Sequence, residues 1–472
     1  MKLATKIALN TIIQIISKII SIGLGLATIA IMTRYLSPIG FGQYTTITTF
    51  ISFFAVAADL GLTLVTVQMI SQPGADQNKV LSNLFSLRIF SAFGFLVIAP
   101  IIVWFLPYDH AIKIGVSIAT LSFLFPALNQ ILVGLFQKHL RLDRVSLAEI
   151  VSRVVLLAGI MLAAWLDWGL NGILAVSVLS ALISFLIHFY YSTKLASIKL
   201  NFEWRVWREI IHRSWPIGLT IVFNLIYLRA DTLLLSFFKS ANEVGIYGAT
   251  YKVIDVLITL PFIFAGIILP ILTSSWFNDR KQFDRVLQKS FDLMSIIALP
   301  LFFGTQFVSE KIMTTVAGKD FAPSGPVLNI LIAAASIIFV GTMFSHAVIA
   351  VDKQRSMIRA YVFVAITSLI GYFIFIPKYS YFGAAWVTIY SELAIGLASF
   401  FVVWRTTNFL PKIKTTAKAL IASVVMCLWF ALTTESINLW LNLALASLIY
   451  FAFLYLIKGI DRQDLNKLFA RD

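Results

Sequence analysis

The sequence is poor in charge and in cysteine. Only 12% of its 472 residues are charged, against about 25% in soluble domains, while 59% are apolar and the mean hydropathy is +0.90. So little charge excludes a water-soluble globule and a disordered chain. The one cysteine, Cys427, excludes a disulfide scaffold, and ordinary glycine and proline contents exclude collagen. A membrane protein remains.

Long apolar runs fill most of the chain, and a membrane-spanning helix needs about 20 such residues. We predict fourteen spans, at 9–33, 41–70, 80–106, 112–137, 147–166, 169–193, 214–238, 245–275, 287–308, 325–351, 357–376, 380–404, 417–434 and 437–457. Short alternating segments typical of a transmembrane barrel are missing. The basic start, Met1–Lys6, leads into the first run without a small-residue cleavage site, so we expect a retained helix and an all-α integral membrane protein.

The cations are distributed unevenly between the two ends of the spans. With the N-terminus in the cytoplasm, and with residues within two positions of a span end counted with the adjoining side, 26 of the 37 Lys and Arg lie on the cytoplasmic side, 6 on the outer side and 5 well inside spans. The positive-inside rule therefore predicts cytoplasmic termini and an even number of spans. It also explains the net charge of +15 without a nucleic-acid partner.

Two sequence echoes indicate an internal repeat. An apolar–Gly–x–Tyr motif occurs at Gly42 and again at Gly245, 203 residues later, and the stretch 170–175 resembles 381–386, at an offset of 211. We therefore predict two six-helix bundles related by a parallel repeat, at 1–200 and 201–410. Residues 411–472 add two C-terminal helices and a cytoplasmic tail. Such a repeat is typical of transporters that rock around a site between two lobes.

The same motifs resemble a known family. Residues Thr33–Tyr44, which read TRYLSPIGFGQY, are similar to the opening signature of the polysaccharide-transport flippases, and Asp59–Leu62 resembles their second-span segment. Asp231 with Val244–Tyr247 resembles their second-lobe motif. The chain is thus identified as a Wzx-type member of the multidrug/oligosaccharidyl-lipid/polysaccharide exporter superfamily. Fourteen spans depart from the twelve of many Wzx-type members and are shared with the lipid II flippases.

This resemblance implies a function and a set of partners. It implies flipping of an undecaprenyl-diphosphate-linked oligosaccharide from the cytoplasmic to the outer leaflet of the bacterial inner membrane. The product would serve O-antigen, capsule or exopolysaccharide synthesis, which makes the polysaccharide polymerase machinery a candidate partner. The substrate itself and membrane lipid are the other expected partners.

Charged residues within the spans are the candidate functional residues. A charge at the bilayer centre costs about 2.5–3.5 kcal/mol, so each must be paired, lie near an interface or line a wet cavity. In the second lobe, Arg229, Asp231, Lys252 and Asp255 lie at similar depth, about 10–15 Å below one turn. We predict a four-charge cluster there, which either stabilises the fold or acts in substrate binding or ion coupling.

In the first lobe, the same depth rule pairs Lys18 with Asp59. Asp59 alternatively holds a coupling cation, Na⁺ or H⁺, because hard cations prefer carboxylate oxygens. Lys18 alternatively binds the substrate.

Two arginines lie about 10–12 Å inside the cytoplasmic ends of their spans, where a diphosphate headgroup would load. They are Arg88 and Arg153, and arginine binds phosphate through paired hydrogen bonds. Arg153 has Glu149 one helical turn away as an alternative partner, whereas Arg88 has no acid within four residues and ranks first. Arg34, at the outer end of the first span, is either an interfacial anchor or a phosphate contact on the release side.

Catalytic motifs are missing. There is no phosphate-binding Walker loop, no GxSxG and no carboxylate pair on a soluble loop, and neither His188 nor His346 has metal-ligand neighbours. We therefore expect a transporter and not an enzyme, without metal or cofactor beyond a coupling cation. Two alternatives stay open. An unpaired acidic site in the outer half would favour a multidrug or small-molecule antiporter. A membrane polysaccharide polymerase would need an outer loop longer than 309–324.

Overall fold

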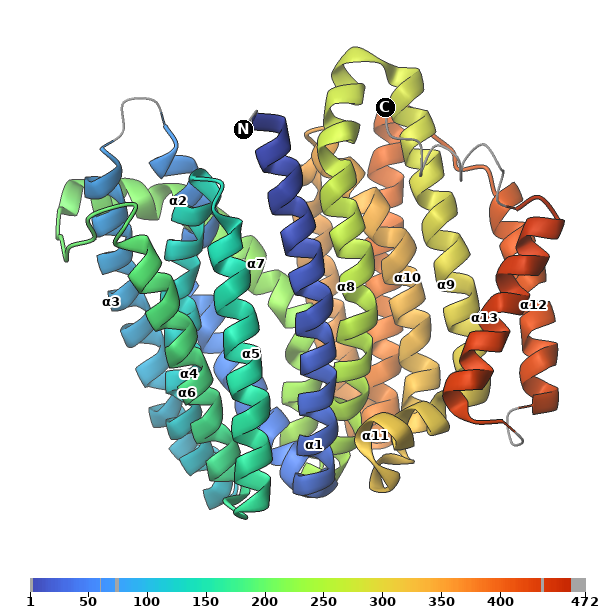
Figure 1. Cartoon of the computed structure of the whole chain (residues 1–472), viewed down its shortest axis with the longest axis horizontal. Coiled ribbons are helices and arrows are strands. Elements are labelled where there is room, and N and C mark those ends of the chain that lie inside the picture. Colours follow the sequence, from blue (N-terminus) through green and yellow to red (C-terminus); the bar gives the residue numbers. More distant parts are fainter. Residues whose placement is uncertain (1–2, 60, 73–75, 434–436, 460–472) are drawn as a thin grey trace. The chain divides into compact units, whose positions relative to one another are not determined.

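The computed structural model describes residues 3–59, 61–72, 76–433 and 437–459 (Figure 1). Within these ranges the structure describes the backbone alone at residues 3–9, 11, 12, 64, 216, 217, 219, 220, 223, 224, 227 and 228. The last residue of the predicted span 417–434 and most of the predicted cytoplasmic tail lie outside the described residues.

Helices make up all the regular structure of the described ranges, apart from a single 3-10 turn, η1 (Lys319–Phe321). In chain order they are α1 (Leu3–Asp59), α2 (Leu62–Ile70), α3 (Gln77–Trp104), α4 (His110–Lys138), α5 (Leu142–Trp165), α6 (Gly169–Ser192), α7 (Trp204–Phe238), α8 (Ala241–Asn278), α9 (Arg280–Ala317), α10 (Ser324–Ala350), α11 (Gln354–Thr407), α12 (Lys414–Thr433) and α13 (Leu439–Leu456). The predicted all-α class is confirmed.

The predicted spans coincide with these helices or with parts of them. The 57-residue α1 is two helices joined at a kink, because Ser37 has φ 54° and ψ 177° and is followed by Pro38. The 54-residue α11 is likewise broken at Ser380, with φ 53°. The second predicted span is the latter part of α1 followed by α2. Among the described residues, eleven helices are long and apolar enough to cross a membrane. The chain is therefore a multi-pass membrane protein.

Contacts divide the chain into two compact units, unit 1 (Met1–Gly248) and unit 2 (Ala249–Asp472). Helix α8 begins in unit 1 and continues into unit 2. The lobe boundaries predicted from the repeat, at 200/201 and 410/411, stay a prediction.

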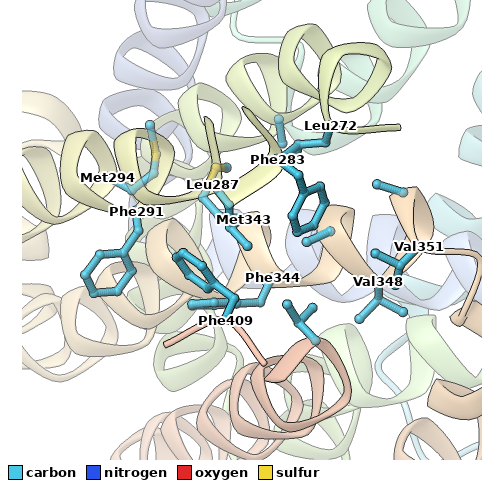
Figure 2. Packing of buried hydrophobic residues seen from close by; sticks show 14 of the residues in the cluster. Leu272, Phe283, Leu287, Phe291, Met294, Met343, Phe344, Val348, Val351 and Phe409 are labelled. Carbon is cyan, nitrogen blue, oxygen red and sulfur yellow. The ribbon is translucent and has the colours of Figure 1, made fainter. Parts of the chain in front are cut away.

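Apolar side chains hold each unit together. In unit 1, α3 packs on α4, α4 on α6, and α5 on both α6 and α1. In unit 2, Phe283 and Leu287 of α9 pack with Met343 and Phe344 of α10, and Phe409 joins them after the end of α11 (Figure 2). Helices α12 and α13 run side by side next to α9 (Figure 1). The two additional C-terminal helices thus belong to unit 2 and share an apolar core with α9.

The second predicted echo of the repeat has a geometric counterpart. Gly169 at the start of α6 has φ 64° and Ser380 within α11 has φ 53°, and these positions are 211 residues apart. Three residues further on, a Cβ added to Gly172 would stand 2.2 Å from Trp168 Cβ. One added to Gly383 would stand 2.4 Å from the Phe375 carbonyl oxygen. Both elbows combine a left-handed turn residue with a close-packed glycine.

The connection between α6 and α7 is an extended segment bound along α3, and we call residues 195–203 the strap. Every second backbone N–H of the strap donates to an α3 side chain at 2.9–3.1 Å, from Ser197 to Asn78, Lys199 to Ser82, Asn201 to Ser86 and Glu203 to Asn83. Because loop N–H groups need partners just as helical ones do, these bonds fix the strap's register. The strap therefore holds the start of α7 against α3.

An exposed ion pair closes the end of the strap. Lys79 Nζ lies 2.6 Å from a Glu203 carboxylate oxygen, and this bond is the main reason why the pKa of Glu203 is lowered. A carboxylate whose pKa is lower in the folded than in the unfolded state stabilises the fold at pH values above its ordinary pKa, about 4.3. That stabilisation is lost as the pH falls through the folded-state value.

We therefore expect Glu203→Gln to lower the Tm of the detergent-solubilised protein at pH 7. The deficit should shrink as the pH falls below about 4.3 and vanish once the pH is below the lowered folded-state pKa of Glu203, where the wild-type carboxyl is protonated too. Glu209→Gln is the matched control, because Glu209 pairs with Arg213 within one exposed helical turn of α7 and should change Tm little. A Tm deficit for Glu203→Gln that persists unchanged at pH 3.5 would contradict this account.

Candidate functional site

Arg88 lies on α3 at the centre of unit 1, and no part of its side chain is exposed. Its Nε donates to the Ala127 carbonyl at 2.8 Å, and its Nη1 donates to the Ala58 carbonyl at 3.1 Å. Its Nη2 donates to Asp59 Oδ1 at 2.7 Å and also contacts the side-chain oxygen of Gln130. The guanidinium is therefore enclosed by acceptors from α1 and α4.

Asp59 ends α1 where the membrane helix breaks. Gly61 has φ 78°, a conformation that glycine adopts without strain, and its N–H donates to Asp59 Oδ2 at 3.2 Å. The Thr63 hydroxyl of α2 donates to Asp59 Oδ1 at 2.5 Å. The carboxylate also lies near the N-terminus of α2, where a helix dipole favours negative charge. Asp59 is thus held by Arg88 from one side and by the start of α2 from the other.

The predicted Lys18–Asp59 pair is wrong. Lys18 Nζ instead lies 3.9 Å from Glu149 Oε1 of α5, and the Lys18 side chain is 45% exposed. The depth rule placed Lys18 and Asp59 at one level of the bilayer, but it does not say toward which neighbouring helix each side chain points. Arg88 reaches Asp59 from another helix, which a search within four residues could not find.

Arg153 on α5 does not form the alternative pair with Glu149. It is half-buried and makes no ion pair within 4 Å of a described residue. One of its guanidinium nitrogens lies 4.0 Å from where a Cβ on Gly25 of α1 would stand. The substrate-binding roles predicted for Arg88, Arg153 and Lys18 stay predictions.

Asp231 on α7 is completely buried in unit 1. Tyr247, also completely buried, donates its hydroxyl to Asp231 Oδ2 at 2.7 Å, and the Thr232 hydroxyl donates to Oδ1 at 3.2 Å. Tyr247 is the tyrosine of the second-lobe motif, but it was not predicted as a partner of Asp231. The depth rule could have found it, because 231 and 247 average 239, close to the turn between α7 and α8.

The other predicted charges of the second lobe are divided between the units. Arg229 is half-buried in unit 1, while Lys252 and Asp255 are half-buried residues of α8 in unit 2. The predicted four-charge cluster therefore stays a prediction. Arg34 is exposed and donates to the Ala30 carbonyl at 2.8 Å, and its anchoring or release role stays a prediction as well.

The two motif glycines of the repeat lie against each other. A Cβ added to Gly42 would stand 1.7 Å from the Ala241 carbonyl oxygen, and one added to Gly245 would stand 1.9 Å from the Pro38 carbonyl oxygen. A Cβ added to Gly248 would stand 2.6 Å from the hydroxyl oxygen of Thr45. We call these residues the glycine contact.

The glycine contact is reciprocal. Pro38 and Ala241, Gly42 and Gly245, and Thr45 and Gly248 are each 203 residues apart, the offset of the predicted repeat. Each motif meets its own equivalent, as in a twofold interface where residue i contacts j and j contacts i. The backbones of α1 and α8 thus meet at equivalent positions where only glycine leaves enough room.

Taken together, the many apolar helices, the reciprocal contact of equivalent motifs and the buried ionic groups define a multi-pass membrane protein. Residues 31–326 match the model of the family described as "Polysaccharide biosynthesis protein". The chain therefore belongs to this family, which agrees with the resemblance to polysaccharide-transport proteins that its motifs predicted.

Two curated relatives are similar to the chain over most of its length. The probable low-salt glycan biosynthesis flippase Agl15 of Haloferax volcanii is 22% identical over 392 residues, 81% of this chain and 80% of that protein. The putative O-antigen transporter of Shigella flexneri is 21% identical over 375 residues, 77% and 89% of the two chains.

The fold resembles two groups of solved transporters. The lipid II flippase MurJ in an inward closed conformation matches with a TM-score of 0.78 and 18% identity, over 95% of this chain and 98% of that one. An inward-facing multidrug resistance transporter of the MATE family matches with a TM-score of 0.63 and 13% identity, over 83% and 94%. These likenesses show the fold alone.

Proposed function

We propose that the chain flips an undecaprenyl-diphosphate-linked oligosaccharide from the cytoplasmic to the outer leaflet of a bacterial cell membrane by alternating access. The family match over residues 31–326 carries this proposal, because relatives matched over most of their length are named as flippases or transporters of glycans. Both termini are placed in the cytoplasm, as the asymmetry of basic residues favours. The polysaccharide polymerase machinery is the proposed downstream partner.

Arg153 is our first candidate for the diphosphate. The N–H groups of Arg88 are directed at acceptors of the protein itself, whereas Arg153 makes no ion pair with a described residue and is half-buried beside α1. An arginine keeps its charge at any physiological pH and binds phosphate oxygens in pairs. Arg88 then positions α1 against α3 and α4.

A coupling cation, Na⁺ or H⁺, belongs to the proposal, with Asp59 and Asp231 as candidate sites. Protonation of Asp59 would neutralise the anion that Arg88 holds and so weaken the packing of α3 on the end of α1. A cation that binds one conformation better than the other shifts their equilibrium by that difference in affinity. This gives an ion gradient a route to bias flipping.

Deletion of the gene followed by mass spectrometry of lipid-linked glycans tests this function. We expect a complete oligosaccharide on undecaprenyl diphosphate to accumulate, protected from periodate added outside intact spheroplasts, and surface polysaccharide to fall. A plasmid copy should reverse both effects. Accumulation of a single repeat unit that periodate reaches would instead indicate a polymerase. An unchanged lipid-linked pool with altered drug susceptibility would indicate an antiporter, and either result overturns the proposal.

A further inference from the structure

A groove of about 320 Å³ lies between α5 and α6 in unit 1. Leu147 and Val151 of α5 line one side, and Leu186 and Ile187 line the other together with two adjacent tyrosines of α6, Tyr190 and Tyr191. Apart from the tyrosine hydroxyls, the lining side chains are apolar, four of them aliphatic and two aromatic. The groove is therefore suited to a hydrocarbon chain.

With both termini in the cytoplasm, as proposed above, the groove would lie where the hydrocarbon core of the bilayer meets the cytoplasmic headgroups. The outer turn between α5 and α6 is centred near residue 168, and both Leu147 with Tyr190 and Val151 with Leu186 average 168.5. At 1.5 Å per residue these two levels are about 32 and 26 Å from the turn. The hydrocarbon core is about 30 Å thick, so the groove opens at the depth of a lipid's first methylenes.

Cations stand over the two tyrosines. The Arg144 guanidinium lies 4.4 Å from the ring centroid of Tyr191, and Lys194 Nζ lies 4.3 Å from that of Tyr190. Such stacking holds a cation in place without neutralising it. Lys194 makes no ion pair within 4 Å of a described residue.

One carboxylate lies near these cations. Arg144 Nε forms an ion pair with one Asp143 carboxylate oxygen at 3.1 Å, and Arg141 Nε donates to the other at 3.2 Å. Two arginines therefore share this carboxylate, and with Lys194 the rim keeps a positive excess.

We propose that this groove binds an anionic phospholipid of the cytoplasmic leaflet, with an acyl chain along Leu147, Val151 and Leu186 and the phosphate at Arg144 and Lys194. The charge complements a phosphodiester, and basic pockets between membrane helices at the cytoplasmic side are typical lipid headgroup sites. The residues that line this groove differ from those proposed to move the oligosaccharide. Lipid occupancy here would clamp α5 to α6 near Arg153.

Photo-crosslinking of the full-length chain in nanodiscs tests this site. The probe is phosphatidylglycerol with a diazirine in the middle of one acyl chain, and phosphatidylcholine with the same chain is the headgroup control. We expect the anionic probe to label the peptides that contain Leu147–Val151 and Leu186–Tyr191 several-fold more than the zwitterionic one. Arg144→Gln and Lys194→Gln should each lower the labelling about five-fold, the effect of one basic residue at an anionic surface.

Arg405→Gln is the matched variant, because Arg405 also stands over an aromatic ring, 5.6 Å from the centroid of Phe401, but does not line the groove. It should leave the labelling unchanged. Val151→Trp should fill the groove and abolish labelling, although both cations remain. Lys194→Gln alters an exposed side chain, so we expect this variant to fold. Equal labelling by the two probes, or labelling that persists in the Arg144→Gln/Lys194→Gln variant, would overturn the proposal.

Discussion

Arg88→Met is expected to cost about 3–5 kcal/mol of folding free energy, because it removes one partner of a buried ion pair and leaves the other charge without compensation. The variant keeps much of the side-chain volume, so the loss would come from charge and not from a cavity. The Asp59 carboxylate and the Ala127 and Ala58 carbonyls each lose a donor. Unfolding of the purified protein in mixed micelles measures the effect.

A double variant separates the structural role of this pair from a role in transport. Arg88→Met with Asp59→Leu replaces both charges by apolar groups, which is often neutral or stabilising for buried pairs, so most of the lost stability should return. If the double variant, expressed in a deletion strain, restores glycan export, the pair only stabilises the fold. If it is stable but inactive, transport uses one of the two charges.

The matched control for Arg88→Met is Lys18→Met, which breaks a pair of the same lobe that is 45% and 34% exposed. Exposed pairs contribute about 0–1 kcal/mol. Equal stability losses in Arg88→Met and Lys18→Met would show that Arg88 is not held as the structure describes.

The sequence could predict the helices because each depends on local composition. In lipid, an apolar run of about 20 residues forms a helix because its backbone N–H and C=O groups find no water and must hydrogen-bond to one another. The runs at 9–33 and 357–376 therefore became helices whatever lies beside them. The sequence also predicted the interruptions, because Ser37 lies between the predicted spans 9–33 and 41–70 and Ser380 begins the predicted span 380–404. The break between Asp59 and Leu62, inside the predicted span 41–70, was not predicted.

The ion pairs were harder to predict because they depend on which face of a helix meets which neighbour. Lys18 and Asp59 lie at a similar depth but form no ion pair with each other. Arg88 pairs with Asp59 because the tertiary fold packs α3 against the end of α1. Tyr247 and Asp231 were within reach of the depth rule, because α7 and α8 are consecutive. Residue numbers give the depth of a side chain along its helix, but they do not give the neighbouring helix toward which it points.

Gly42→Ala and Gly245→Ala are each expected to force the glycine contact open. The added methyl would stand 1.7 Å or 1.9 Å from a backbone carbonyl oxygen, and backbone cannot move aside as a flexible side chain can. Overpacking of this kind costs about 1–3 kcal/mol, which shifts a two-state equilibrium by roughly 5- to 150-fold. We therefore expect conformations in which α1 and α8 are apart at this point to gain population.

Labelling of a cysteine at Thr45 by an impermeant maleimide measures this shift, in a background where Cys427 is replaced by serine. Thr45 is 5% exposed and lies beside Gly248, so the wild-type rate should be slow. Gly42→Ala should raise it several-fold and change glycan export. Gly23→Ala on α1 and Gly266→Ala on α8 are the controls, because nothing lies within 4 Å of a Cβ at either position.

Reciprocity adds a stricter expectation. If the contact relates two equivalent halves, Gly42→Ala and Gly245→Ala remove the same close approach from opposite sides and should raise the labelling rate by similar factors. Once one methyl has separated the backbones, the second meets open space, so the double variant should exceed either single variant only slightly. Multiplicative effects would show two independent packing sites. A Gly42→Ala variant that labels like Gly23→Ala would show that this contact does not hold α1 and α8 together.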